Sequence, residues 1–157
     1  MSTALTETCL SVEPDWVDYN GHMNLAFYVL AFDKATDNFY DQLGIGLDYR
    51  AREDSSMFTL GINVDYRREV FADDELLITT QLLEVDNKRL RYIHQMYQGG
   101  DASPVALNEC LAIHVNMKSR KSEPFPDLTQ NRITAAMDTH RHLPQPPSAG
   151  RTLGKKL

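Results

Sequence analysis

The chain has 157 residues, of which 42% are hydrophobic and 24% charged, and its formal net charge at pH 7 is −6. This length and composition fit one compact globular domain, and no apolar run is long enough to span a membrane. The acidic balance argues against general affinity for nucleic acids. Residues 1–8 lack the basic and apolar parts of a secretion signal, and Cys9 and Cys110 form no CxxC pair, so we expect a reduced, cytoplasmic protein.

The first predicted elements are a short strand over residues 8–12 and one long helix. From about Asn24 to Leu43, apolar residues recur at helical spacing. Asn24 is a typical residue for the start of a helix, and Gly44 is typical of the position just after the end of one. Because this helix carries large aromatic side chains along one face, we expect it to form part of the core.

Four strands are predicted after the helix, over about residues 58–66, 76–85, 90–96 and 105–117. Turn sequences separate the last three strands, and antiparallel hairpins are the simplest connection among all four. We therefore predict an α+β domain in which one curved antiparallel sheet of about five strands wraps around the long helix.

The remaining C-terminal residues are predicted to form a loop over 120–126 and a short helix that begins at Asp127 or Thr129 and ends near Met137. Proline, glycine and lysine dominate from residue 143 onward, which indicates weak order. The sequence thus predicts a single domain over residues 1–142 and a C-terminal tail over residues 143–157.

The clearest chemical motif directly precedes the long helix. Asp18, Gly21 and His22 lie within seven residues that end at Asn24. A helix start presents unpaired backbone N–H groups and a partial positive charge. A carboxylate beside it can act as base or nucleophile on a carbonyl that these groups polarise. Alternatively, Asp18 only caps the turn or the helix. For His22 the alternatives are orienting Asp18, binding substrate, or donating to a backbone carbonyl.

Four segments together resemble the hotdog-fold thioesterases of the 4-hydroxybenzoyl-CoA thioesterase type, over about residues 10–127. The matching segments are Asp18–Asn24, Asp65–Arg67, Asp86–Leu90 and Arg120–Pro126. The resemblance implies a hotdog fold and hydrolysis of an acyl-CoA thioester, with coenzyme A as part of the substrate and no metal or other cofactor. It also implies a homodimer or a dimer of dimers, with joined sheets and with sites at the interface.

The resemblance also implies roles for individual residues. Asp18 matches the nucleophile or general base, the backbone N–H near Leu25 matches the group that polarises the carbonyl, and His22 is a further catalytic candidate. Candidate substrate-binding residues are Trp16, Asn20, Gly21, Asn24, Tyr28, Phe58, Tyr66 and Glu109. Candidates for binding the phosphates of coenzyme A are Lys88, Arg89, Arg120 and Lys121. The alternative for these four is that they are solvated ends of hairpins.

A narrower resemblance rests on Asn20–Asn24, Asp86–Leu90 and the sequence of residues 114–116. These segments resemble the thioesterase domain fused to some L-carnitine dehydrogenases and its free-standing relatives, which are associated with hydrolysis of betainyl-CoA in carnitine degradation. Aromatic faces and a carboxylate can bind a trimethylammonium group. Glu109 interrupts an apolar strand register. It is therefore a second acid in the pocket, a contact for such a cationic substrate, or the partner of an arginine across the sheet or dimer interface.

Other functions remain as alternatives. Within the same class, the substrate could be a short-chain or aromatic acyl-CoA. A hotdog hydratase or dehydratase usually needs a helix-borne acid working with a histidine, and the helix offers Asp33 and Asp37 without a histidine pair. A non-catalytic acyl-CoA binding protein would not need Asp18 at the catalytic spacing. We expect His94 and His114 to complete structural hydrogen bonds, because no cluster has convincing metal-ligand spacing.

Overall fold

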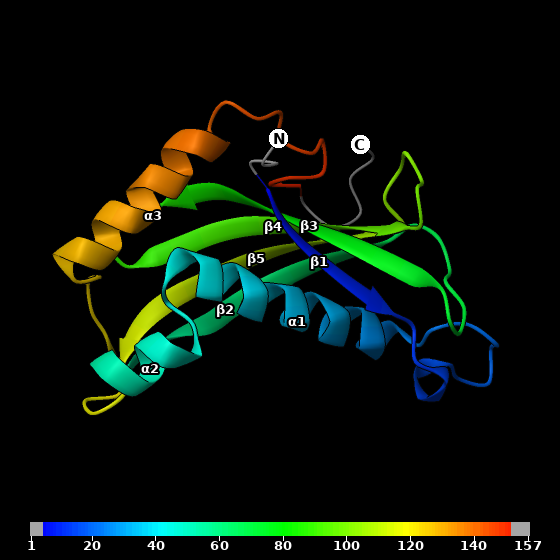
Figure 1. Ribbon diagram of the computed structural model, residues 1–157, viewed down its shortest axis with the longest axis horizontal. Coiled ribbons are helices and arrows are strands. Elements are labelled where there is room, and N and C mark those ends of the chain that lie inside the picture. Colours follow the sequence, from blue (N-terminus) through cyan, green and yellow to red (C-terminus); the bar gives the residue numbers. More distant parts are fainter. Residues whose placement is uncertain (1–4, 152–157) are drawn as a thin grey trace.

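The structure is a computed structural model that describes residues 5–151. Its elements are β1 (Thr6–Ser11), the 3-10 helix η1 (Pro14–Trp16), α1 (Leu25–Leu43), α2 (Leu47–Glu53), β2 (Ser55–Tyr66), β3 (Glu75–Val85), β4 (Arg89–Gln98), β5 (Ala106–Asn116), β6 (Lys121–Ser122) and α3 (Asp127–His140). Figure 1 shows one sheet curving over α1, with α3 beside β3. Within residues 5–151, no helix is long and apolar enough to cross a membrane.

The five long strands follow the order β1-β3-β4-β5-β2, and each is antiparallel to its neighbours. This confirms the predicted hotdog fold, and β6 adds a short pairing at the end of β5. The predicted hairpin between β2 and β3 is wrong, because β2 pairs with β5 and lies at the sheet edge. The connection over residues 67–74 is tied to the N-terminal segment, where the N–H of Val12 donates to Asp74 and that of Met23 to Val70. This connection therefore places the start of β3 next to β1.

Helix α1 has the limits that the sequence predicts. The side chain of Asn24 accepts a hydrogen bond from the N–H of Ala26 at 3.0 Å, and Gly44 ends the helix with φ of 73°. Phe32 is fully buried and stacks on His94 of β4, with ring centroids 5.6 Å apart. The aromatic stripe of α1 thus fills the concave face of the sheet.

The two faces of β5 differ. Cys110 and Ala112 belong to a buried cluster that includes Phe39 of α1, so they lie on the inner face. Leu107 belongs to a separate cluster with Ile93, on the face away from α1. Because side chains alternate along a strand, the register that contains Glu109 lies on this outer face. It does not line the main core.

Two helices differ from the sequence prediction, and both pack against the sheet. Helix α2 is not predicted by the sequence, and its Tyr49 hydroxyl lies 2.8 Å from Nε2 of His114 on β5. Helix α3 extends beyond the predicted end, to His140, whose Nδ1 accepts the N–H of Leu82 at 2.7 Å. β1 pairs with the first half of β3, over residues 75–80. The His140 side chain binds the same edge of β3 further along, where β1 no longer pairs with it.

Composition predicts a weakly ordered tail from residue 143, and this division of the chain stays a prediction. The described part of the segment nevertheless contacts the sheet. The N–H of Gly150 donates to Glu109 at 2.7 Å, and Nε of Arg151 donates to Asp65 at 2.9 Å. Residues 152–157, the rest of the predicted tail, lie outside the described residues.

Candidate active site

The loop before α1 holds Asp18 in a fixed orientation. One carboxylate oxygen accepts the backbone N–H of Asn20 and the other accepts Nδ2 of Asn24, both at 2.8 Å. Gly21 closes the turn with φ of 82°, a conformation that glycine adopts without strain, and its N–H donates to the carbonyl of Asp18. Because Asn24 also caps the helix, one side chain joins Asp18 to the start of α1.

The hydrogen bonds to Asp18 also fix its charge. Donation from the Asn24 amide, and then from the Asn20 N–H, lowers the pKa of Asp18 below its usual value, and nearby His22 acts in the same direction. Partial burial opposes this shift. Asp18 is therefore an ionised carboxylate at neutral pH, which is the form that a general base or a nucleophile requires.

The first turn of α1 offers a free donor next to this carboxylate. The N–H of Ala26 is bound by the Asn24 side chain and that of Phe27 by the Asn24 carbonyl. Among residues 5–151, the N–H of Leu25 has no hydrogen-bond partner. A helix N-terminus concentrates partial positive charge, so this N–H can stabilise a developing oxyanion. It is the group that the sequence predicts.

A cavity of about 280 Å³ opens at this end of α1. It is lined by His22, Met23, Leu25, Tyr28, Tyr66, Arg67, Arg68 and Glu69. The Nδ1 of His22 donates to the Met23 carbonyl at 3.1 Å, while its Nε2 lies 3.9 Å from a carboxylate oxygen of Glu69. Of the three alternatives for His22, the contacts thus show donation to a backbone carbonyl.

The aromatic candidates near Asp18 have different surroundings. Trp16 is buried and stacks on Phe27, with ring centroids 5.7 Å apart. Tyr28 and Tyr66 meet edge to face at 5.2 Å and both line the cavity. Burial raises the pKa of both phenols, so they remain neutral donors. Only these two of the predicted aromatic residues border the cavity beside Leu25.

The predicted phosphate-binding residues lie together at the opposite end of the sheet. The Lys88 ammonium lies 3.4 Å from the Ser122 hydroxyl, and the Arg120 guanidinium lies 5.7 Å from the centre of the Phe58 ring. Phe58 and Tyr66 stand eight residues apart on β2, or about 25 Å along a strand. Phe58 and the basic residues are therefore remote from Asp18 of the same chain.

Comparisons with known proteins decide the family. Residues 12–133 match the family model described as the thioesterase-like superfamily. The chain belongs to this superfamily. It is 38% identical to the betainyl-CoA thioesterase of Pseudomonas aeruginosa over 98% of this chain and 97% of that protein. It is also 31% identical to the L-carnitine dehydrogenase/betainyl-CoA thioesterase of a Rhizobium species, over 92% of this chain but 29% of that protein.

Solved structures of similar fold support the architecture. A proposed thioesterase from Pseudomonas putida aligns with a TM-score of 0.83 and 33% identity, over 100% of this chain and 99% of that chain. A Staphylococcus aureus protein of unassigned function, solved with CoA, aligns with a TM-score of 0.88 over 97% of this chain and 96% of that chain. Its identity is 24%, so it shows only the fold of this superfamily member.

Glu109 lies away from the active-site end of this superfamily member. Its carboxylate accepts Nη1 of Arg91 at 2.6 Å and the N–H of Gly150 at 2.7 Å. Of the three alternatives for Glu109, the contacts show the ion pair across the sheet. The apolar register that Glu109 interrupts lies on the outer face of the sheet. The charged pair stays partly solvated there, and Glu109 does not line the inner core.

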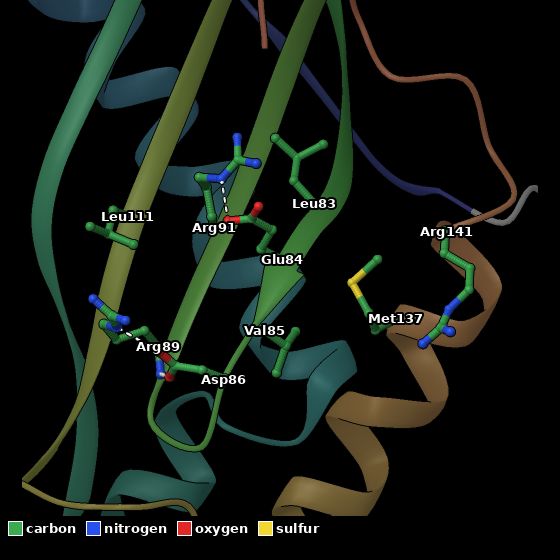
Figure 2. A pocket seen from close by; sticks show the side chains of 9 residues that line it. All are labelled: Leu83, Glu84, Val85, Asp86, Arg89, Arg91, Leu111, Met137 and Arg141. Atoms are coloured by element: carbon green, nitrogen blue, oxygen red, sulfur yellow. Dashed lines mark hydrogen bonds and ion pairs between the residues drawn. The ribbon is translucent and has the colours of Figure 1, made fainter. Parts of the chain in front are cut away.

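A larger cavity than the one beside Leu25 lies on the same outer face, beside α3. It measures about 720 Å³, and Figure 2 shows Leu83, Val85, Leu111 and Met137 around it together with arginines. Each arginine in view has a carboxylate partner: Arg89 pairs with Asp86, Arg91 with Glu84, and Arg141 with Asp138. Arg89, a predicted phosphate contact, is thus already paired within its own chain.

The sequence prediction omitted part of the cavity wall. Arg67, Arg68 and Glu69 follow β2 directly and line the cavity beside His22. The sequence does carry a signal for these residues, because two arginines directly follow the candidate Tyr66. What was missing was the path of residues 67–74, which returns to the N-terminal segment. Within residues 5–151, no group of three or more acidic, histidine or cysteine side chains could hold a metal ion.

Proposed function

We propose that this protein hydrolyses the thioester bond of betainyl-CoA, giving glycine betaine and free coenzyme A. The observation that carries the proposal is the full-length identity of 38% to a betainyl-CoA thioesterase. The ionised Asp18 beside the open N–H of Leu25 supplies the chemistry that such a reaction needs. In this proposal the enzyme works in the cytoplasm, in carnitine degradation, without a metal or other cofactor.

The reaction follows from the geometry at the start of α1. The thioester carbonyl oxygen accepts the N–H of Leu25, which makes the carbonyl carbon more electrophilic. Asp18 then either takes a proton from an attacking water or attacks the carbon itself to form an anhydride that water hydrolyses. In both routes the C–S bond breaks, the thiolate of coenzyme A takes up a proton, and the oxygen of one water enters the product acid or the carboxylate of Asp18.

We further propose that the enzyme works as a homodimer joined through its β2 edges. β2 is an edge strand, and it exposes Phe58, Leu60 and Ile62. Such an apolar edge favours pairing with a second strand. Antiparallel pairing about a two-fold axis near Ile62 would bring the basic end of one subunit towards Tyr66 of the other. One coenzyme A could then contact Asp18 of one subunit and the basic residues of its partner. A dimer of dimers remains compatible.

A row of carboxylates lies further along α1. Asp33, Asp37 and Asp41 are spaced four residues apart and line a groove of about 410 Å³ between α1 and β2. Burial raises the pKa of Asp37, and the neighbouring carboxylates Asp33 and Asp41 raise it further. Asp33, the nearest of the three to Leu25, lies about 12 Å from it along the helix axis. A betainyl group whose carbonyl binds the N–H of Leu25 does not span this distance, so the proposed cationic acyl group rests on the identity to the betainyl-CoA thioesterase and not on this row.

A panel of acyl-CoA thioesters tests the proposal, with thiol release as the readout. Betainyl-CoA should exceed its neutral tert-butyl isostere in kcat/KM by about tenfold or more, equivalent to ~1.4 kcal/mol. Faster hydrolysis of butyryl- or benzoyl-CoA would overturn the betainyl assignment and leave a thioesterase of another substrate. Formation of a double bond would indicate a dehydratase, and tight binding without turnover would indicate a binding protein.

A further inference from the structure

A chain of contacts runs from the C-terminal segment to the first turn of α1. We propose that Tyr66 positions this turn for acyl transfer, and that Arg151 holds Tyr66 in place through Asp65. The inference rests on the proposed function, because it concerns the N–H of Leu25 as the oxyanion donor. It makes Tyr66 and Arg151 positioning residues, which act through another group and not on the reacting atoms.

The contact between Tyr66 and α1 reaches the residue whose orientation matters most. The Tyr66 hydroxyl donates to the carbonyl of Leu25 at 3.1 Å, and its ring meets Tyr28 edge to face. Fixing the carbonyl of Leu25 restricts rotation of the residue that also carries the open N–H. An oxyanion donor lowers the barrier only when it already points at the place where the charge develops.

Tyr66 stands at the end of an edge strand. It is the last residue of β2, and its side chain is 47% exposed. The N–H groups of Arg67 and Arg68, which follow it, both donate to the carbonyl of Val105. These bonds hold the backbone on the side of β5, and the opposite edge of β2 has no neighbouring strand among the described residues. The ends of edge strands open more readily than central strands, so a further contact near Tyr66 limits movement of its hydroxyl relative to α1.

Arg151 supplies a further restraint on the opposite face. Its Nε donates to Asp65 at 2.9 Å, a second guanidinium nitrogen contacts the other oxygen, and both side chains are more than four-fifths buried. Asn63 donates from Nδ2 to the Arg151 carbonyl at 3.2 Å. A two-point contact of this kind fixes orientation as well as distance. Asp65 and Tyr66 are adjacent, so their side chains point to opposite faces of the strand. Holding the Asp65 side chain therefore also fixes the backbone orientation that sets the direction of the Tyr66 side chain.

The C-terminal segment is itself anchored before it reaches Asp65. Ser148 is buried, Ala149 packs against the outer-face cluster of Leu83, Ile93 and Leu107, and Gly150 donates to Glu109. Arg151 therefore approaches β2 from a fixed direction. Glu109 thus anchors the segment that leads to Arg151.

The first experiment compares Tyr66→Phe with the matched control Tyr97→Phe, a tyrosine of β4 outside the site. Tyr66→Phe removes one hydroxyl and keeps the ring against Tyr28. We expect kcat with betainyl-CoA to fall about tenfold while KM changes less than twofold, and the control to keep both constants. An unchanged kcat, or a rise in KM alone, would overturn the positioning role of Tyr66.

The second experiment tests the connection through Arg151. Arg151→Ala should lower kcat about threefold without changing KM. The control Arg141→Ala, which alters an exposed arginine directly after α3, should leave both constants unchanged. In the Tyr66→Phe background, Arg151→Ala should have no further effect, because both residues act along one path. Independent, multiplicative effects would overturn the connection. Arg151 lies on the other face of β2 from Tyr66, so the kcat of Arg151→Ala alone, measured on folded protein, tests the connection if Tyr66→Phe does not fold.

The two proposals fail in different ways. If the unmodified protein releases no thiol from any acyl-CoA, the proposed function is wrong. If the unmodified protein is active and both variants retain its kcat, the function stands and this inference is wrong. Melting temperatures of all variants, measured under the assay conditions, show that a lower kcat does not come from unfolded protein.

Discussion

The two ends of the sheet are built in different ways. At the end near Asp18, seven consecutive residues hold one another through short hydrogen bonds and continue into a capped helix. At the other end, Arg120 from the turn after β5 lies over Phe58 of β2, and Lys88 from the turn between β3 and β4 contacts Ser122 of β6. The first end has the fixed hydrogen-bond geometry that bond-making requires, and the second gathers positive charge that suits phosphate binding. The difference suggests separate contributions to kcat and KM.

The largest expected effect is at the rigid end. Asp18→Asn keeps the shape of the side chain and removes the charge that accepts a proton or attacks the carbonyl. We expect kcat to fall at least about 100-fold, the lower end of a general-base contribution, with little change in KM. Steady-state kinetics with thiol detection measure both constants. Near-normal turnover by a folded Asp18→Asn protein would show that the chemistry takes place elsewhere.

At the exposed end we expect a smaller effect on the other constant. The double variant Lys88→Ala/Arg120→Ala should raise KM about tenfold, equivalent to ~1.4 kcal/mol of binding, and leave kcat unchanged. The difference from the unmodified protein should shrink as salt is added, because ions screen exposed charges. Lys34→Ala, which removes an exposed cation from α1, is the control. A fall in kcat without a rise in KM would contradict the assignment of chemistry to the end near Asp18 and of coenzyme A binding to the end near Phe58.

A third prediction concerns the pH dependence of the rigid end. The Asn24 amide is the largest cause of the lowered pKa of Asp18, so activity that depends on ionised Asp18 should persist well below neutral pH. Asn24→Asp keeps an oxygen to cap α1 but places a second carboxylate beside Asp18, which raises its pKa. The acidic limb of the kcat profile should therefore move to higher pH, by about one unit or more. An unmoved limb would mean that another group controls it.

The middle of the sheet should respond to acid through stability and not through chemistry. Full burial lowers the pKa of His94 to about 3, and its ring bonds to Thr36 and Thr80. Since the unfolded chain binds this proton near pH 6.5, the free energy of unfolding should fall as pH drops from about 6.5 towards 3, by up to ~1.4 kcal/mol per pH unit. Urea unfolding at pH 7 and pH 4.5 measures the loss, which should be smaller in His94→Gln. Equal losses in both proteins would show that carboxylates alone cause it.

The sequence determines much of the rigid end by itself. Asp18, Asn24 and the start of α1 are neighbours in the chain, so their relative positions follow from turn and helix geometry. The period of α1 and the alternation of the strands likewise follow from local spacing, and they predict a helix beneath a sheet. The identity of the free N–H at Leu25 follows from the position of the helix cap.

Only the tertiary structure decides which strands pair and which face a register occupies. Alternation gives a strand two faces but does not say which of them meets the helix, so Glu109 could be placed on either side from sequence alone. The pairing of β2 with β5, the return of residues 67–74 to the cavity beside His22, and the contact of Arg151 with Asp65 all join segments distant in the chain. Such contacts depend on how the whole chain buries its apolar surface, which no local pattern specifies.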